Sequence, residues 1–227
     1  RPILWHIMKG YASHGVNDFI ICAGYKGYVI KEYFANYFLH MADVTFHMEE
    51  NRMEVHEQNA EPWRVTIVDT GDATQTGGRV ARIRRYVEND EAFFMTYGDG
   101  LSNVDIEALY TFHREHGAMA TMTTVCPPGR FGQVDIEGDR IKSFAGKPEG
   151  DGYWINGGFF VLESGIFDYI DSDNTVWERA PLEQLAAAGE LAAWRHDGFW
   201  QPMDTLRDHI SLEALWNDGN APGKTWK

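Results

Sequence analysis

The stretch FFMTYGDG at residues 93–100 begins as an uncharged, apolar run and ends in an aspartate between two glycines. Such a run is typical of a strand that is buried on both faces of a sheet. Asp99 is the first charge at the carboxyl end of this strand, where open α/β sheets bind their ligands. Gly98 and Gly100 add no side-chain bulk, so a ligand can approach the backbone closely. We therefore expect an α/β fold with Asp99 at its ligand-binding edge.

Strand and helix patterns alternate along the rest of the chain. Apolar or alternating runs predict further strands at residues 19–23, 43–48, 63–68, 120–125, 133–136, 140–144, 154–162 and 191–196. Helical spacing predicts helices at residues 2–14, 28–39, 79–87, 105–116, 166–170, 180–188 and 205–217. Residues 49–64 show no helical period, and we interpret them as an excursion that could be a hairpin. This order predicts a single domain over residues 1–227, with a Rossmann-like mixed, mostly parallel sheet flanked by helices; the alternative is two subdomains that divide near residue 145.

The composition excludes several classes of protein. The chain has 227 residues, 44% of them hydrophobic, which is typical of a globular protein and not of a disordered one. Its formal net charge of −14 repels nucleic acid and anionic membranes, so we expect neither as a partner. The chain contains no apolar run of about 18 residues, which is the length that a helix needs to cross a bilayer. Cys22 and Cys126 are too few for a disulfide framework, which favours a reduced, cytoplasmic setting.

Two carboxylates are candidate metal ligands. Asp99 at a strand end suits Mg²⁺, which takes hard oxygen ligands together with substrate phosphates. Asp204 precedes the predicted helix at 205–217, which Thr205 and Asp208 could open with a capping box. Each has a structural alternative, since Asp99 could cap the helix at 105–116 and Asp204 could be an ordinary capping acid. The residues alone leave both readings open.

Three further motifs could meet an anion or a metal ion. The loop from Thr74 to Arg79 opens a helix, where free backbone N–H groups and the Arg79 side chain could form a cradle for an anion or a base. Lys147 follows a predicted strand and could contact a phosphate, or lie exposed in a loop. Asp171 and Asp173 form a D-x-D pattern like that of metal-dependent glycosyltransferases, but they follow a helical stretch, so we expect a solvated turn.

Longer motifs together resemble one family, the glucose-1-phosphate cytidylyltransferases, which are sugar-nucleotide pyrophosphorylases of the nucleotidyltransferase superfamily. The resemblance runs over essentially the whole chain. Its most specific segments are DFIICAGYKGYVIKEYF at 18–34, ENRMEVH at 50–56, VDTG at 68–71, YGDG at 97–100, PPGRFG at 127–132, INGGFF at 155–160 and FWQPMDTLRD at 199–208. The resemblance implies transfer of a cytidylyl group from CTP to glucose 1-phosphate, giving CDP-glucose and pyrophosphate for nucleotide-sugar and lipopolysaccharide O-antigen synthesis.

The resemblance also implies roles for particular residues. It implies that Asp99 and Asp204 hold a Mg²⁺ ion and that Lys147 contacts the sugar phosphate and takes part in catalysis with them. The residues implied for the nucleotide are Thr74, Arg79 and Gly98, and those for the sugar are Asn156 and Gly157. The reaction would be an in-line attack of the sugar phosphate on the α-phosphorus, without a covalent enzyme intermediate. We also expect a homo-oligomer, with the excursion at 49–64 as a candidate interface.

Two features depart from the family pattern. Members begin with a strand and a glycine-rich loop, G-G-x-G-T-R, whereas Arg1-Pro2 matches the residues just after that segment. The family's Glu-Lys-Pro reads Gly146-Lys147-Pro148. We therefore expect the first strand to be lacking and the 227-residue chain to be a poor enzyme. Two alternatives are a non-catalytic relative that binds a sugar nucleotide or has a structural role, and a glycosyltransferase that uses Asp171 and Asp173.

Overall fold

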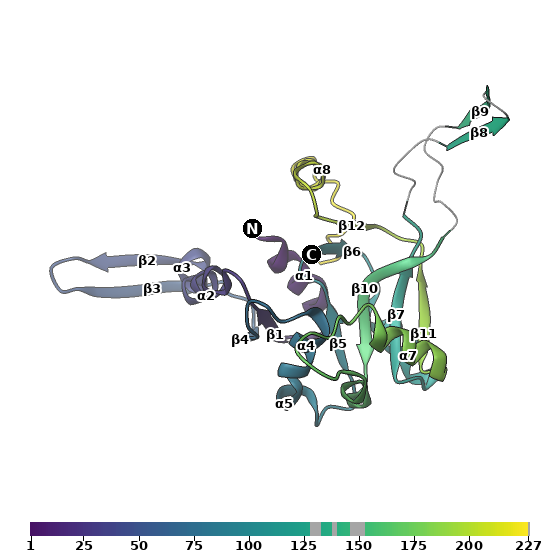
Figure 1. Ribbon diagram of the computed structural model, residues 1–227. Coiled ribbons are helices and arrows are strands. Elements are labelled where there is room, and N and C mark those ends of the chain that lie inside the picture. The colour runs from purple at the N-terminus through teal and green to yellow at the C-terminus, as the bar shows by residue number, and fades with distance from the viewer. Residues whose placement is uncertain (128–132, 138–139, 146–152, 227) are drawn as a thin grey trace. The chain divides into compact units, whose positions relative to one another are not determined.

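The computed structural model describes residues 1–127, 133–137, 140–145 and 153–226, whose backbone forms two compact units. Unit 1 comprises Arg1–Gly15, Asp90–Ile166 and Leu182–Lys227, and unit 2 comprises Val16–Asn89 and Phe167–Pro181. Each is an α/β arrangement of sheets and helices, and each is described by itself (Figure 1). Residue 145 lies within a continuous segment of unit 1, so the units do not divide there.

The main sheet of unit 1 has four strands in the order β11-β7-β10-β5. Their bounds are β5 Phe93–Thr96, β7 Ala120–Val125, β10 Ile155–Leu162 and β11 Leu191–His196. β7 is parallel to β11, and β10 is antiparallel to both β7 and β5. The register of β10 shifts between Asn156 and Phe160, where Gly157 and Gly158 interrupt the strand. Within the described residues, β5 pairs with β10 alone.

Two short ladders complete the strands of unit 1. β6 (Gly100–Ser102) pairs antiparallel with β12 (Trp200–Pro202), and β8 (Gln133–Glu137) pairs antiparallel with β9 (Arg140–Ala145). The sequence predicts β8 and β9, but it does not predict β6 and β12. A strand of three residues is too short to show an alternating pattern, so only the structure reveals this ladder.

α1 (Ile3–Ala12) and α6 (Ile106–His116) pack apolar side chains onto this sheet, whereas α8 (Leu206–Asn217) has no buried residue. α7 (Ala180–Ala188) and the 3₁₀ helix η1 (Ser164–Tyr169) each span a boundary between the units. Asp105 caps α6 by accepting a hydrogen bond from the Ala108 N–H at 2.9 Å. α6 ends at Gly117, whose positive φ of 70° closes the helix. The most deeply buried side chains include Met8, Leu109, Phe160, Leu162 and Leu185.

Unit 2 is built around a parallel pair, β1 (Asp18–Ala23) and β4 (Arg64–Asp69). Its helices are α2 Gly27–Ala35, α3 Tyr37–Met41, α4 Thr76–Arg82 and α5 Arg84–Val87. β2 (Ala42–His47) and β3 (Arg52–Gln58) form an antiparallel hairpin that extends beyond α2 and α3 (Figure 1). The hairpin therefore spans residues 42–58, and the expected excursion at 49–64 was placed too late in the chain.

The remaining expectations for the elements are confirmed with small changes. The helix predicted at 28–39 is divided at Asn36 into α2 and α3. The helix predicted at 79–87 begins earlier, at Thr76, and is divided at Ile83. The stretch predicted as helix at 166–170 falls largely within η1. The α/β fold class is confirmed, since helices flank mixed parallel and antiparallel strands. The expectation of a mostly parallel sheet is wrong for the described ladders, of which only β1–β4 and β7–β11 are parallel.

Candidate active site

The short β6–β12 ladder brings Asp99 and Asp204 together in unit 1. Gly100 pairs with Pro202, and the backbone N–H of Met203 donates to the carbonyl oxygen of Asp99 at 2.8 Å. Asp99 comes just before β6 and Asp204 comes just after β12, so both carboxylates lie at the same end of the ladder. The pKa of Asp99 is raised, first because the side chain is partly desolvated and then because of the nearby charge of Asp204.

Neither carboxylate serves the capping role that the sequence left open. Asp105 is the cap of α6, so Asp99 is not. At α8 the N-cap is Thr205, which forms the predicted capping box with Asp208. The Thr205 hydroxyl accepts from the Asp208 N–H at 3.2 Å, and the Asp208 carboxylate accepts from the Thr205 N–H at 2.9 Å. Asp204 therefore lies just outside a helix end that is already closed.

The pair fits a divalent cation of the kind that nucleotidyltransferases generally use. Two carboxylates that repel each other, one of them with a raised pKa, are stabilised by a cation placed between them. Among the described residues no group of three or more His, Cys, Asp and Glu could form a closed metal site. A cation held here would need further oxygen ligands from a substrate or from water, which is the usual arrangement for Mg²⁺.

The glycine-interrupted start of β10 lies against the segment that leads to Asp99. The Asn156 amide donates to the Tyr97 hydroxyl at 3.1 Å, and its carbonyl oxygen accepts from the Gly158 N–H at 2.8 Å. The Trp200 indole donates to the carbonyl oxygen of Gly157 at 2.8 Å. These bonds connect the start of β10 to the segment just before Asp99 and to β12. Unit 1 thus gathers Gly98, Asp99, Asn156, Gly157 and Asp204 from three separate segments.

The two glycines of β10 are required by close packing. A Cβ on Gly157 would lie 3.0 Å from the Thr123 carbonyl oxygen. Gly158 has a φ of +80°, and a Cβ there would lie 2.5 Å from the Tyr97 ring. By contrast, a Cβ on Gly98 would meet no atom within 4 Å. Space beside the backbone therefore remains at Gly98, next to Asp99.

Sequence reasoning missed two residues of this site, Tyr97 and Trp200. Their hydrogen-bond partners are 59 and 43 residues away along the chain, so no local pattern could reveal them. Each holds the segment that carries a candidate sugar-binding residue. They act by positioning Asn156 and Gly157.

Unit 2 places Thr74 and Arg79 near the carboxyl ends of β1 and β4. The Arg79 guanidinium donates to the Thr70 hydroxyl at 2.7 Å and to the Ala23 carbonyl oxygen at 3.4 Å. A Cβ on Gly24 would lie 2.5 Å from this guanidinium, so any other residue there would displace the Arg79 side chain. Thr74 is 8% exposed. The two candidates therefore lie at the strand ends where an α/β fold binds ligands.

The expected cradle of free N–H groups at the start of α4 is wrong. The Gln75 N–H donates to the Asp173 carbonyl oxygen at 2.8 Å, and those of Gly77 and Gly78 donate to Thr175 at 2.9 and 3.2 Å. A Cβ on Gly78 would lie 2.5 Å from the Asp173 backbone. The glycines of this loop therefore allow close packing within unit 2, and the N–H groups are not available to an anion.

The D-x-D pattern forms a turn, as expected, and one of its carboxylates is engaged. Arg82 donates to the two oxygens of Asp173 at 2.9 and 2.5 Å. This bidentate contact lowers the pKa of Asp173. A carboxylate held by an arginine is a poor metal ligand, which argues against the glycosyltransferase alternative. Lys147 and Gly146 lie outside the described residues.

Within the described part of the chain, no helix combines the length and the apolar character that a membrane crossing requires.

Comparisons with known proteins show to which family the chain belongs. The family model described as nucleotidyl transferase matches residues 1–202. The glucose-1-phosphate cytidylyltransferase of Salmonella typhi is 63% identical over 227 residues, which are 100% of this chain and 88% of that protein. The probable glucose-1-phosphate cytidylyltransferase of Bacillus subtilis is 42% identical over the same shares of the two chains.

Solved structures share the fold at much lower identity. HddC from Yersinia pseudotuberculosis superposes with a TM-score of 0.68 at 17% identity, covering 95% of this chain and 86% of that one. A UDP-glucose pyrophosphorylase complexed with UDP-glucose gives a TM-score of 0.65 at 13% identity, covering 96% of this chain and 88% of that one. These structures show the fold, and the family model together with the 63% identical relative shows the family. The chain belongs to the nucleotidyl transferase family and, within it, to the glucose-1-phosphate cytidylyltransferases.

Proposed function

We propose that the protein transfers a cytidylyl group from CTP to α-D-glucose 1-phosphate, giving CDP-glucose and pyrophosphate. The observation that carries this conclusion is the 63% identity over the whole chain to the cytidylyltransferase of Salmonella typhi. Structural support comes from the paired carboxylates Asp99 and Asp204, which suit the metal-assisted handling of a nucleoside triphosphate by a chain of net charge −14.

We propose a task for each candidate residue. Asp99 and Asp204 hold the divalent metal, for which we name Mg²⁺; when bound, it neutralises charge on the phosphates and orients them. Asn156 and Gly157 bind the sugar, and Tyr97 and Trp200 position them. The nucleotide is bound by Thr74, Arg79 and Gly98, and Lys147 contacts the sugar phosphate.

The reaction is an in-line displacement. An oxygen of the sugar phosphate forms a bond to the α-phosphorus of CTP while the bond to the β-phosphate oxygen breaks, and pyrophosphate leaves. No covalent intermediate on the protein is needed, so the protein's part is to position the two phosphates and stabilise their charge. The partly desolvated Asp99 carboxylate and the Asn156 amide suit that role. Hydrogen bonds to Tyr97 and Gly158 hold Asn156 in place before substrate arrives.

The cysteines and the net charge also bear on the protein's compartment and partners. Cys22 and Cys126 are free thiols, which suits a reducing compartment, so we place the protein in the cytoplasm. We also propose that it assembles as a homo-oligomer. Nucleic acid and membranes are not partners, because the net charge of −14 repels both.

The test measures CDP-glucose and pyrophosphate formed from CTP and glucose 1-phosphate with Mg²⁺. We expect both products in equal amounts and a higher kcat/KM with CTP than with UTP, because the two bases present opposite hydrogen-bonding patterns at ring position 4. Each group left unpaired by the wrong base costs about 1–3 kcal/mol. Equal kcat/KM values for CTP and UTP would overturn the base assignment. Binding of CDP-glucose without any turnover would instead support a non-catalytic relative.

A further inference from the structure

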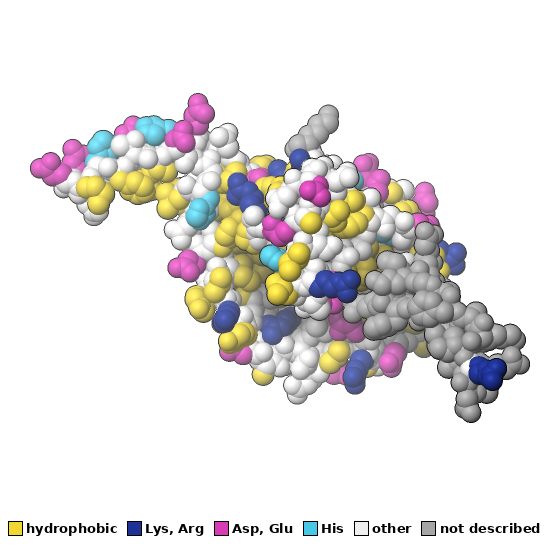
Figure 2. All heavy atoms as spheres, turned by 90° about the horizontal axis from the view of Figure 1, so that it is seen from above, with side chains coloured by type: hydrophobic (Ala, Val, Ile, Leu, Met, Phe, Trp, Pro, Cys, Tyr) yellow, Lys and Arg dark blue, Asp and Glu magenta, His cyan; other side chains and the backbone are white. Residues whose placement is uncertain are grey.

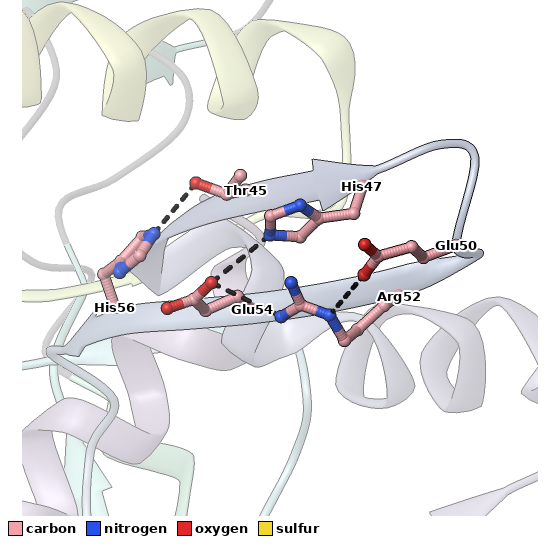
Figure 3. Close-up of polar contacts among 6 residues, drawn as sticks. All are labelled: Thr45, His47, Glu50, Arg52, Glu54 and His56. Carbon is pink, nitrogen blue, oxygen red and sulfur yellow. Dashed lines mark hydrogen bonds and ion pairs between the residues drawn. The ribbon is translucent and has the colours of Figure 1, made fainter.

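The β2–β3 hairpin of unit 2 has two chemically different faces. On one face, His47 and Glu54 make a contact of 3.3 Å, and Arg52 reaches Glu50 at 3.1 Å and Glu54 at 3.4 Å. Thr45 and His56 are joined at 2.9 Å on the same face (Figure 3). These polar side chains therefore find partners within the hairpin itself.

The opposite face is apolar and exposed. The side chains of Phe46 and Met53, which lie opposite each other, are 59% and 41% exposed, and Val44 pairs with Val55 on the same face. Figure 2 shows this division, with acidic and histidine side chains on one side of the hairpin and hydrophobic ones on the other. An isolated two-stranded hairpin is marginally stable in water, because it has too few strands to bury such a face.

The two outer edges of the hairpin differ in regularity. In the described structure β2 and β3 pair only with each other. The register shifts between Ala42 and Val44: β3 advances by three positions, from Val55 to Gln58, while β2 advances by two. β3 therefore carries the bulge, and a bulge interrupts an edge and turns it away from further pairing. β2 is the regular edge.

We propose that β2 pairs antiparallel with β2 of a second copy of this chain, about a two-fold axis at Thr45. This inference deepens the homo-oligomer named under the proposed function and rests on it. The pairing turns two hairpins into one four-stranded sheet in the order β3-β2-β2-β3. It satisfies the backbone groups of both β2 edges and makes the two apolar faces continuous.

The sequence of β2 is complementary to itself about Thr45, which is why the proposed occupant is a second copy. Val44 would lie opposite Phe46 of the second copy, so that an apolar residue meets an apolar one on both sides of the axis. Asp43 would lie opposite His47 of the second copy, so that a carboxylate meets an imidazole N–H. Both relations occur twice by symmetry.

The edge of β3 offers no such match. Pairing β3 with itself about Val55 would place Met53 opposite Glu57 of the second copy, and the bulge would fall within the contact. On the apolar face, a two-fold contact through β2 brings only uncharged side chains together. It therefore adds no repulsion there between two copies that each carry a net charge of −14.

Cross-linking tests the register. Thr45→Cys places a thiol on the proposed axis, where directly opposite residues bring their Cβ atoms within roughly 4.5–5.5 Å, close to disulfide range. Under mild oxidation we expect most of this variant to become a covalent dimer. Asp43→Cys, on the same strand and face, should not cross-link to itself, because each introduced thiol would face His47 of the other copy. The parent protein, with Cys22 and Cys126, sets the background. Equal cross-linking of the two variants, or none of either, would overturn the register.

Light scattering tests the interface as a whole. We expect the wild type to have at least twice the mass of the 25.9 kDa chain, and Phe46→Glu at least to halve the measured mass. Tyr28→Glu is the matched control, because Tyr28 is 66% exposed on α2, outside the hairpin, and its change should leave the mass unaltered. A monomeric wild type would overturn both the oligomer and its interface. An oligomer that Phe46→Glu leaves intact would overturn the interface alone, and neither result bears on CTP turnover.

Discussion

Met203 donates its backbone N–H to the carbonyl oxygen of Asp99 at 2.8 Å. This bond continues the β6–β12 ladder by one step and places Asp204 next to Asp99. The pKa of Asp99 is raised by partial burial and, to a lesser degree, by the charge of Asp204. The site therefore holds two carboxylates in an arrangement that a cation would stabilise.

The first prediction concerns these two carboxylates. Asp99→Asn and Asp204→Asn each remove one ligand charge, and each should lower kcat at saturating Mg²⁺ by more than the roughly 10–100-fold that changes around a metal site cost. Steady-state pyrophosphate release measures the effect, with the exposed Asp197→Asn as the matched control. Near-parental rates in both variants would mean that the two residues do not share a metal ion.

The second prediction follows from the raised pKa of Asp99. The folded state binds this proton more tightly than the unfolded state does, so the contribution of Asp99 to the free energy of unfolding falls as pH rises from the usual aspartate range through the raised pKa. Above that pKa it stays at its lower level. Without metal, Asp99→Asn should therefore gain stability relative to the wild type as pH rises through this range. Thermal melts at a series of pH values measure the difference.

Mg²⁺ provides the control for that pH experiment. It should raise the Tm of the wild type at neutral pH, because it binds the ionised pair in the folded state. It should raise the Tm of Asp99→Asn less. A stability difference that does not change with pH, together with equal Mg²⁺ effects on both proteins, would contradict the assignment.

The third prediction separates backbone strain from packing at Gly158. Gly158→Ala forces a side chain into a left-handed conformation, which costs about 1–3 kcal/mol, and it also drives the Cβ against the Tyr97 ring. Gly189→Ala is the matched control, because its φ is +76° and a Cβ there would meet no atom within 4 Å. Urea unfolding should show a larger loss for Gly158→Ala, with a raised KM for glucose 1-phosphate. Equal losses of stability would show that the Tyr97 ring moves aside without lowering the free energy of unfolding.

Local patterns predicted much of this fold because they report local physics. The Thr205–Asp208 spacing predicted a capping box, which the structure contains, since a cap depends only on neighbouring residues. The apolar run before Gly98 predicted a strand, and β5 lies there, but its four residues are half-buried and the expected burial on both faces is wrong. The same reasoning placed Asp99 and Asp204 each at the end of an element. Only the family resemblance implied that the two residues lie close together.

What the sequence could not predict depends on contacts between distant segments. β6 and β12 are three residues each and are defined by their pairing with one another. The N–H groups at the start of α4 looked free because their acceptors, Asp173 and Thr175, lie far along the chain. Satisfied backbone groups are the rule in folded proteins, so a glycine-rich helix start is weak support for an anion site.

The last prediction tests whether the α8 cap positions Asp204. Thr205→Ala removes the hydroxyl that accepts from the Asp208 N–H, which should lower the free energy of unfolding by about 0.5–2 kcal/mol. Because Thr205 follows Asp204 directly, the loosened helix start should also lower kcat at saturating Mg²⁺. Asp105→Ala is the matched control, since it removes the cap of α6 at a similar expected loss of stability. Chemical denaturation and pyrophosphate release, measured on both variants, separate the two effects. If both lose stability and both keep the parental kcat, the cap supports the helix alone and Asp204 is held by the β6–β12 ladder.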